Sequence, residues 1–295
     1  DSKFVEVKQG PYDENSDNLL SFIENISTYI INDTLNFNGE TGIVIGSGLD
    51  HIVNLLEHKQ TLPYHKINLF PQSSVDGHKG EFISGYVGNS QVLLARGRLH
   101  YYEGIELEEV IMPLKIFHKL GVKNIIITNS SGSLRLKNSI GSLMLIDGHY
   151  DCTFLSNEEV PKLIDGESYY NKNMMDLVLS SAKKTGIDLL IGKYCWMLGP
   201  AYETPAEIKF LKSIGGDAVG MSTLPEIEYA KKLGMKIIVL SALTNFAAGL
   251  KNEVLKHKDV LSNAKKIEGN LSKLIQKLMA IWALLMELLL MMMEQ

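Results

Sequence analysis

Short apolar runs, most of them followed by a polar motif, constrain the fold of this chain more than any other feature. The runs are rich in β-branched residues and lie at 42–45, 92–95, 125–128, 143–146, 193–197 and 236–240. Their length and their Gly, Asn or Pro boundaries are typical of strands. Helical patterns occur between or before them, at 19–30, 106–120, 171–185, 205–214 and 225–233. This alternation predicts an α/β fold with three layers, a central and mostly parallel mixed sheet flanked by helices.

Six polar motifs are placed where these apolar strands end. They are GSGL at 46–49, GRLHYYEG at 97–104, TNSSG at 128–132, GPAYETPAE at 199–207, GMSTLPE at 220–226 and SALTNFAAG at 241–249. Ligands of open α/β sheets bind beyond the carboxyl ends of the strands, so we expect the motifs to converge on one crevice. Their hydroxyl, guanidinium, imidazole, carboxylate, carboxamide and aromatic groups suit a ligand that combines a phosphate, a sugar and a heterocycle.

The composition excludes several classes of protein. A net charge of −5 and a pI near 5.9 argue against a nucleic-acid binder. Cys152 and Cys195 are far apart and form no CxxC, so a disulfide framework or thiolate metal site is not expected. We interpret them as buried or incidental thiols in a reducing compartment. No signal-peptide pattern opens the sequence, which makes the cytoplasm the default location.

The chain is expected to form one main domain. Residues 1–16 are polar and predict a flexible N-terminus, residues 17–278 the domain, and residues 279–295 an apolar C-terminal helix or tail. The run from Leu278 to Met293 contains Glu287 and is shorter than the ~20 residues needed to span a bilayer. A buried terminal helix is therefore favoured over membrane contact.

Three of the motifs carry groups that bind oxyanions. The turn at 46–48 offers backbone N–H groups and the Ser47 hydroxyl, although a glycine turn after a strand is common without a ligand. Arg98 and His100 alternate along an extended segment and so point to one side, with Tyr102 continuing the row. Ser222 precedes a helix opened by Pro225, where it serves either a ligand or the helix N-cap.

Together with FPQSSVDGHKGEF at 70–82, these motifs in this order resemble the trimeric class of purine nucleoside phosphorylases over about residues 17–278. The resemblance implies the nucleoside-phosphorylase fold and phosphate-dependent cleavage of 6-oxopurine nucleosides to free base and ribose 1-phosphate, a step of purine salvage. It implies a cytoplasmic homotrimer that uses inorganic phosphate as co-substrate, with no cofactor and no metal. Purine nucleoside and phosphate are the expected partners, and neither nucleic acid nor a membrane is.

The resemblance also assigns residues to the two halves of a site. The implied phosphate site is Ser47, His78, Arg98, His100, Ser130 (through its backbone) and Ser222. The implied nucleoside site is Tyr102, Tyr202, Glu203, Val219, Gly220, Met221, Thr244, Asn245 and His257. Among these, the implied catalytic residues are Glu203, Asn245, His100 and His257, the last at the ribose 5′-hydroxyl. His78 matches a mobile loop beside the phosphate.

Three features depart from the family pattern. Asp50 stands where the family has the last glycine of GSGLG, and serines 130, 131 and 133 interrupt its TNAAGG motif. The 147–170 segment is shorter than in members whose loop carries an aromatic residue over the neighbouring subunit's ribose. Phe154 is the candidate for that role here.

Two alternatives accompany the main hypothesis. A methylthioadenosine-type phosphorylase resembles this chain, but the family pattern has Asp there in place of Asn245. A non-catalytic nucleoside-binding protein on the same scaffold is the other, because a fold does not fix a function. A serine hydrolase, a zinc protease and a dinucleotide oxidoreductase are excluded by the absence of their motifs.

Overall fold

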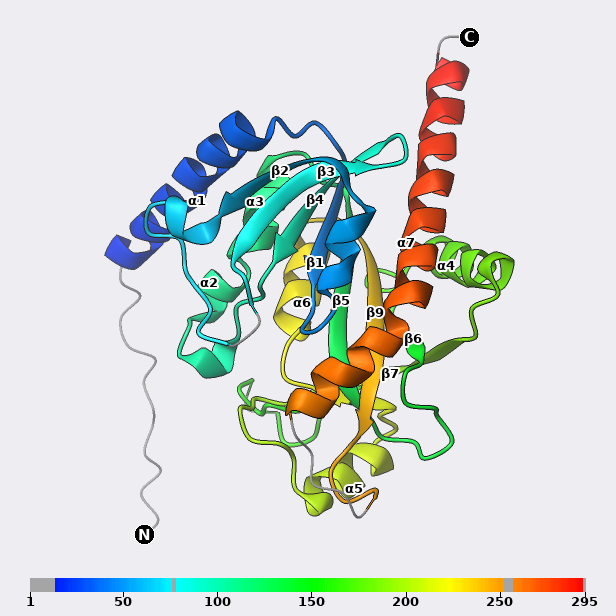
Figure 1. Ribbon diagram of the computed structural model, residues 1–295. Helices are drawn as coiled ribbons and strands as arrows, with labels where there is room; N and C mark the ends of the chain where they lie inside the picture. Colours follow the sequence, from blue (N-terminus) through cyan, green and yellow to red (C-terminus); the bar gives the residue numbers. More distant parts are fainter. Residues whose placement is uncertain (1–13, 76–77, 157, 252–256, 294–295) are drawn as a thin grey trace.

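A computed structural model of the chain describes residues 14–75, 78–156, 158–251 and 257–293 (Figure 1). Its strands are β1 Thr41–Ile45, β2 Glu57–Pro63, β3 Glu81–Val87, β4 Ser90–Arg96, β5 Asn124–Ser133, β6 Leu143–Asp151, β7 Leu189–Trp196, β8 Ala218–Gly220 and β9 Lys236–Phe246. They form a single sheet of order β2-β3-β4-β1-β5-β8-β7-β6-β9, in which β5 also pairs with β9. The pairs β1–β4, β1–β5, β5–β9, β6–β7 and β7–β8 are parallel, and the others are antiparallel. The expected mixed sheet is confirmed.

The helices are α1 Glu14–Leu35, α2 Leu107–Val110, α3 Met112–Lys119, α4 Lys172–Thr185, α5 Pro205–Ser213, α6 Leu224–Lys232 and α7 His257–Met293. Short 3₁₀ turns η1 Asp50–Leu55, η2 Tyr64–Lys66 and η3 Tyr101–Glu103 connect strands. Every helical pattern of the sequence coincides with one or two of these helices. The glycines that end them do so with positive φ angles, as at Gly186, where φ is 71°.

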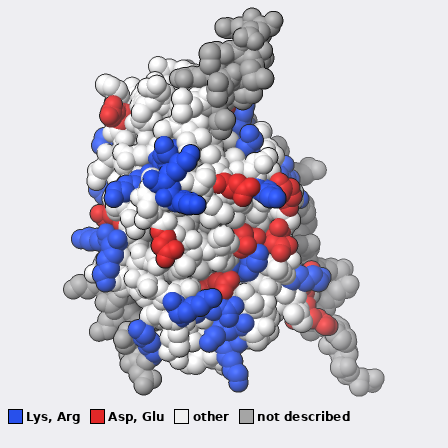
Figure 2. All heavy atoms as spheres, turned by 90° about the vertical axis from the view of Figure 1, so that its right-hand side faces the viewer, with Lys and Arg blue, Asp and Glu red and all other residues white. Residues whose placement is uncertain are grey.

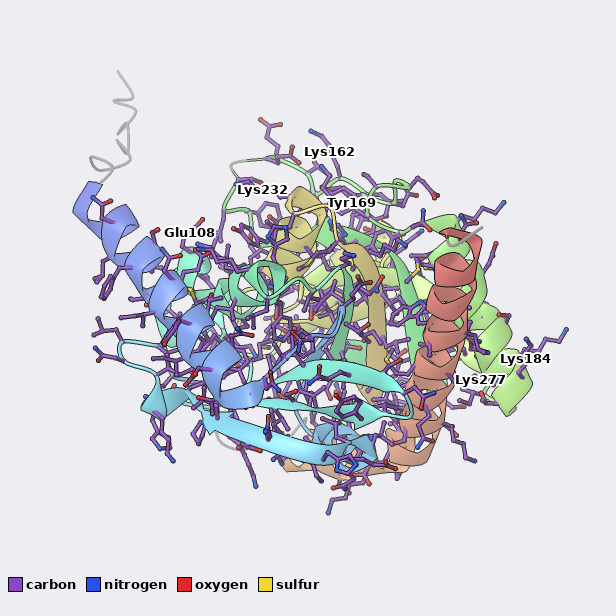
Figure 3. The ribbon with its side chains drawn as sticks, turned by 90° about the horizontal axis from the view of Figure 1, so that it is seen from above. Glu108, Lys162, Tyr169, Lys184, Lys232 and Lys277 are labelled. Atoms are coloured by element: carbon purple, nitrogen blue, oxygen red, sulfur yellow. The ribbon has the colours of Figure 1, made fainter. Side chains whose placement is uncertain are left out.

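Helices cover both faces of the sheet because strand residues alternate between two cores. Val44 and Val239 pack with α1, α3 and α6, whereas Ile43 and Ile238 pack with α4 and α7. Figure 3 shows α1 and α7 on opposite sides of the molecule. A third, smaller cluster joins α5 to β7 and β8 and contains both cysteines, which are buried and free, as the sequence predicted.

The structure corrects two details of the strand predictions. The strands β2, β3 and β8 were not predicted, since β2 is an edge strand with mostly exposed polar side chains and β8 has only three residues. The motifs TNSSG and SALTNF lie within β5 and β9 and do not follow them. Both strands continue because their backbones stay paired as far as Ser133 and Phe246.

The first and last described helices, α1 and α7, differ from the terminal segments expected from the sequence. Of the expected flexible segment 1–16, residues 1–13 lie outside the described residues, and α1 begins at Glu14. The expected boundary at 278 falls inside α7, whose side chains at Leu278, Met279 and Trp282 are buried. Among the helices that are described, none is long and apolar enough to cross a membrane. Figure 2 shows side chains of both charges on the face that carries α4 and α7.

Candidate active site

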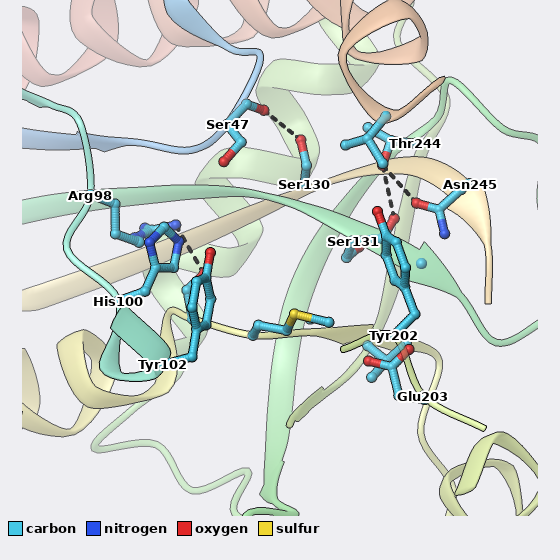
Figure 4. A pocket seen from close by; sticks show the side chains of 16 residues that line it. Ser47, Arg98, His100, Tyr102, Ser130, Ser131, Tyr202, Glu203, Thr244 and Asn245 are labelled. Carbon is cyan, nitrogen blue, oxygen red and sulfur yellow. Dashed lines mark hydrogen bonds between the residues drawn. The ribbon is translucent and has the colours of Figure 1, made fainter. Parts of the chain in front are cut away.

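The motif residues meet in one pocket beside the ends of β1, β5, β8 and β9 (Figure 4). It is lined by Ser47, Arg98, His100, Tyr102, Ser130, Ser131, Gly132, Tyr202, Glu203, Val219, Gly220, Met221, Ser222, Thr244, Asn245 and Val260. Segments up to about 200 positions apart in the sequence thus converge, as the position of the motifs predicted. All of the assigned residues whose side chains are described are there, apart from His78.

The glycine turn after β1 is held close to β5 and α7. A Cβ atom on Gly46 would lie 2.6 Å from the Asn129 Cα, so only glycine fits. Gly48 has a φ of 74°, and a Cβ there would meet Ala264 at 2.9 Å. The Ser130 hydroxyl donates to the Ser47 carbonyl at 2.7 Å, which fixes the turn with Ser47 facing the pocket. Ser130, one of the serines that depart from the family motif, therefore has a hydrogen-bond partner in the fold.

Arg98 is the buried cation of the pocket. Its Nε donates to Glu226 Oε1 at 2.6 Å, and both side chains are 3% exposed. Its Nη1 donates to the Ser222 hydroxyl at 3.2 Å. Its Nη2 is buried and has no hydrogen-bond partner among the described residues. A buried cationic donor without a partner is suited to an oxyanion ligand.

His100 is oriented by Glu103, a residue that the sequence analysis did not single out. Glu103 Oε1 accepts from the His100 backbone N–H and faces its Nδ1 at 3.0 Å, which leaves Nε2 for the pocket. Burial alone would raise the pKa of Glu103, but hydrogen bonds from His100, Ser74 and Ser73 together lower it to about 2. Tyr102 lies in η3 and not in an extended row, but it still reaches the pocket.

His78 lies against Ser47 and Arg98 without lining the pocket itself. Its Nδ1 is 2.7 Å from the Arg98 carbonyl, which can only accept, so Nδ1 carries a proton. Its Nε2 lies 2.9 Å from the Ser47 hydroxyl, and its ring stacks on His100 at 5.0 Å. Burial, followed by the nearby His100 and Arg98, lowers the pKa of His78 to about 4. The imidazole is therefore neutral at pH 7.

The opposite side of the pocket carries Glu203 and Asn245. Glu203 is 7% exposed, and no other side chain of the described residues donates a hydrogen bond to its carboxylate. Burial, with a smaller contribution from Glu207, raises its pKa. The Asn245 amide is fixed, because Oδ1 accepts from the Thr244 hydroxyl and Nδ2 donates to the Phe246 carbonyl, both at 3.0 Å.

The remaining predicted residues complete the walls. Val219, Gly220 and Met221 come from β8 and the turn after it, and Tyr202 is 40% exposed at the rim. His257 begins α7, but its side chain lies outside those described. Phe154 is 48% exposed and does not line the pocket.

Residues that sequence reasoning missed supply the second layer of the site. Glu103 and Glu226 lie inside motifs that were singled out, GRLHYYEG and GMSTLPE, and the spacing of Glu103 three positions after His100 was an available signal. Asp50 replaces the glycine of the family motif and accepts a hydrogen bond from Arg96 at 2.7 Å. Among the described side chains, no group of three or more His, Cys, Asp or Glu is arranged to hold a metal ion.

Comparison with known proteins now identifies the family. The family model described as "Phosphorylase superfamily" matches residues 40–280. Purine nucleoside phosphorylase 1 of Bacillus subtilis (strain 168) is 34% identical over 248 residues, covering 81% of this chain and 91% of that protein. The chain belongs to the phosphorylase superfamily.

Two solved structures show how far the fold is shared. Isoform 2 of purine nucleoside phosphorylase from Schistosoma mansoni, in complex with cytosine and ribose-1-phosphate, has a TM-score of 0.80 and 29% identity, covering 88% of this chain and 95% of that one. The Schistosoma mansoni purine nucleoside phosphorylase in complex with inosine has a TM-score of 0.78 and 27% identity, covering 88% and 95%. The resemblance found from the motifs is confirmed.

Proposed function

We propose that this protein cleaves the N-glycosidic bond of purine nucleosides with inorganic phosphate and releases the free base and ribose 1-phosphate, a reaction of purine salvage. The observation that carries the proposal is the pairing of two unlike walls. One wall contains Arg98, whose buried Nη2 has no hydrogen-bond partner among the described residues, and the other presents the Glu203 carboxylate and the fixed Asn245 amide. A relative of the same fold binds ribose-1-phosphate and another binds inosine.

The phosphate wall suits an attacking dianion. Arg98 supplies charge, while Ser47, Ser222 and His100 Nε2 supply hydrogen-bonding groups around it. The Arg98 guanidinium is held in place by Glu226 before the ligand arrives, so little reorganisation of this donor is needed during the reaction. In this mechanism phosphate itself is the nucleophile, and no covalent intermediate with the protein is formed.

The base wall suits a purine that gains negative charge as it leaves. Asn245 Nδ2 has a second hydrogen for O6 or for N7, both of which are acceptors in a 6-oxopurine nucleoside. Glu203 accepts from N1–H and from a 2-amino group. Each of these hydrogen bonds strengthens as charge moves onto the base, which is preferential binding of the transition state.

Asn245 favours a 6-oxopurine over a 6-aminopurine. An adenine amino group would oppose the Asn245 N–H donor and leave buried groups unpaired, at about 1–3 kcal/mol each. The methylthioadenosine-type alternative is therefore less well supported. The names of the relatives support an enzyme over a non-catalytic binding protein.

A homotrimer in the cytoplasm is the corresponding proposal for assembly and location. Support for assembly comes from apolar side chains exposed on the loop after β6, with Leu155 43% and Val160 58% exposed. Sedimentation analysis that gives three times the 32.9 kDa chain mass is expected, and a monomer at micromolar concentration would contradict it.

The decisive experiment measures base release from inosine, guanosine and adenosine, with and without inorganic phosphate. We expect release from inosine and guanosine that requires phosphate and yields ribose 1-phosphate. Equal release in phosphate-free buffer would identify a hydrolase. No release from any of the three would leave only the binding function.

A further inference from the structure

A chain of buried hydroxyl and amide groups runs behind the pocket, from Ser131 to Ser222. Ser131 Oγ and Ser241 Oγ are 2.6 Å apart, and Ser241 Oγ donates to Asn129 Oδ1 at 2.6 Å. Asn129 Nδ2 donates to Thr223 Oγ1 at 3.0 Å, and Thr223 Oγ1 lies 3.2 Å from Ser222 Oγ. The three middle residues, Ser241, Asn129 and Thr223, are at most 1% exposed and do not line the pocket.

The hydrogen bonds of this chain run in one direction from Ser131 as far as Thr223. Ser241 has one hydroxyl hydrogen and donates it to Asn129, so its oxygen accepts from Ser131. Asn129 then donates to Thr223, whose own hydrogen can go to the Ser222 hydroxyl or to the Tyr194 hydroxyl, while the Tyr194 hydrogen goes to the Ser222 carbonyl. The reverse direction would leave the Ser131 hydroxyl hydrogen without an acceptor among the described residues, at a position only 3% exposed.

The direction of the chain determines what Ser222 can do. With the Thr223 hydrogen on Ser222, the Ser222 oxygen accepts one hydrogen bond from Thr223 and one from Arg98 Nη1. Its own hydrogen is therefore committed to neither neighbour. Because Ser222 lines the pocket beside Arg98, that hydrogen is available to an oxyanion.

The backbone of Thr223 is in a conformation that is unfavourable for a threonine. Its φ is +81° and its ψ −42°, and Leu224 N donates to the Ser222 carbonyl at 3.0 Å, which closes a strained γ-turn. A β-branched residue rarely adopts a positive φ, and glycine would remove the strain. Thr223 also precedes α6 as its N-cap residue without a side-chain capping bond. The hydroxyl is thus used in the chain of hydrogen bonds and not to cap the helix.

We propose that Thr223, supported by Asn129, is a positioning residue that makes the Ser222 hydroxyl a hydrogen-bond donor to the phosphate co-substrate. The inference rests on the phosphate site proposed above and adds residues that do not touch the ligand. This role requires a hydroxyl at position 223, because the hydroxyl donates to the Ser222 oxygen and glycine, which would relieve the strain, has none.

Three substitutions at Thr223 test the proposal by separating the hydroxyl from the rest of the side chain. Thr223→Val keeps the branched shape without the hydroxyl, Thr223→Ser keeps the hydroxyl without the methyl, and Thr223→Gly has neither and relieves the strain. We expect the phosphate KM to rise roughly 10- to 100-fold in the Val and Gly variants, as for loss of a hydrogen bond to a charged group. The Ser variant should stay within about twofold of the parent, and the inosine KM should change little in all three.

A second set of variants asks whether Thr223 acts through Ser222. In a Ser222→Ala background, Thr223→Val should raise the phosphate KM no further, because its effect is already lost. Ser181→Ala is the matched control, since it removes a buried hydroxyl from α4 that bonds only to the Leu177 carbonyl. It should leave the phosphate KM unchanged.

The outcomes distinguish this inference from the proposed function. If the parent releases base without phosphate, the proposed function fails. If the parent needs phosphate but the phosphate KM follows side-chain shape, with Val normal and Ser raised, the positioning role is overturned while the function stands. Should Thr223→Val not fold, Thr223→Gly provides the same comparison in a backbone that glycine adopts readily.

Discussion

The two walls of the pocket differ in whether their buried charged side chains have partners. On the phosphate wall the buried Arg98 is paired with Glu226, and His100 is held by Glu103. On the base wall Glu203 is buried without a side-chain donor among the described residues, and its pKa is raised as a result. The charged groups of the phosphate wall are therefore paired before the ligand binds. The base wall holds an unfavourable buried charge, and in the proposed function a purine N–H would pair with it, so that binding energy is gained at the leaving group.

The largest effect is expected for Arg98→Ala. It removes the cationic donor and leaves Glu226 buried without a partner, so both activity and stability should fall. We expect kcat/KM with respect to phosphate to drop roughly 100- to 1,000-fold, and the unfolding free energy to drop by about 3–5 kcal/mol. Steady-state kinetics and denaturant unfolding measure the two quantities.

A double variant separates the two losses. Arg98→Ala with Glu226→Ala removes both buried charges and should recover much of the stability but none of the activity. Arg135→Ala is the control, because Arg135 pairs with Asp217 at 2.7 Å and does not line the pocket. An Arg98→Ala protein with unchanged phosphate dependence would show that this wall does not bind phosphate.

Glu203→Gln should lower activity but raise stability, whereas Arg98→Ala should lower both. We expect kcat/KM for inosine to fall roughly 100-fold, because a hydrogen bond to the departing base is lost. The folded state raises the pKa of Glu203, so its contribution to stability is present at low pH and lost as the pH rises through that pKa. At neutral and alkaline pH the Gln variant should therefore have the higher Tm, and at acidic pH the two should agree.

The neighbouring Glu207 is a matched control for the expected rise in Tm, because its carboxylate has hydrogen-bond donors. Its pKa is lowered by hydrogen bonds from Thr204, whose backbone N–H it accepts in the capping box of α5. Glu207→Ala should therefore decrease Tm modestly and leave inosine turnover unchanged. A Glu203→Gln variant less stable than the parent at pH 8 would mean that the base wall stores no unfavourable charge.

The next effect concerns base selectivity on that wall. Asn245→Asp should lose activity on inosine and gain relative activity on adenosine, since a carboxylate accepts from a 6-amino group. The kcat/KM ratio of inosine to adenosine should shift roughly 10- to 100-fold. The cost is a carboxylate oxygen facing the Phe246 carbonyl, where the amide now donates at 3.0 Å.

Glu203 should remain necessary for both substrates in the Asn245→Asp protein. A wild-type protein that already prefers adenosine, or a ratio unmoved by the substitution, would show that Asn245 is not the discriminating residue. The 6-oxopurine assignment would then be wrong.

The sequence predicted the fold and the first layer of the pocket for identifiable reasons. Strands such as Ile43–Ile45 are buried on both sides and therefore appear in the sequence as continuous apolar runs. The motif residues lie near the strand ends, which is where α/β sheets bind their ligands. The polar edge strand β2 offered no such signal.

The second layer could not be predicted because it depends on contacts across the fold. Glu226 pairs with Arg98 from 128 positions away, and nothing local marks either as a partner. The positive φ of Thr223 is equally invisible, because threonine normally avoids it. Only the resemblance assigned His78, and its position against Ser47 and Arg98 required the folded chain.

The smallest effect is expected at His78, where the phosphate wall also contains a group whose protonation state depends on the ligand. Without phosphate its pKa is about 4, because of burial and of the nearby His100 and Arg98. A bound dianion beside Ser47 supplies negative charge that favours the imidazolium, so the pKa should rise and a proton should be taken up. With that proton, Nε2 changes from accepting the Ser47 hydroxyl hydrogen to donating, which releases Ser47 toward the phosphate.

Calorimetry of phosphate binding at pH 7, in two buffers of different protonation enthalpy, measures this uptake. The parent should take up a fraction of a proton more than His78→Gln, and its phosphate affinity should rise more steeply as the pH falls toward 6.5. The titration of phosphate itself is common to both proteins and cancels in the comparison. His65→Gln, an exposed histidine in η2, should match the parent. Identical uptake by the parent and His78→Gln would mean that His78 stays neutral, and the phosphate wall would then be fixed in protonation as well as in geometry.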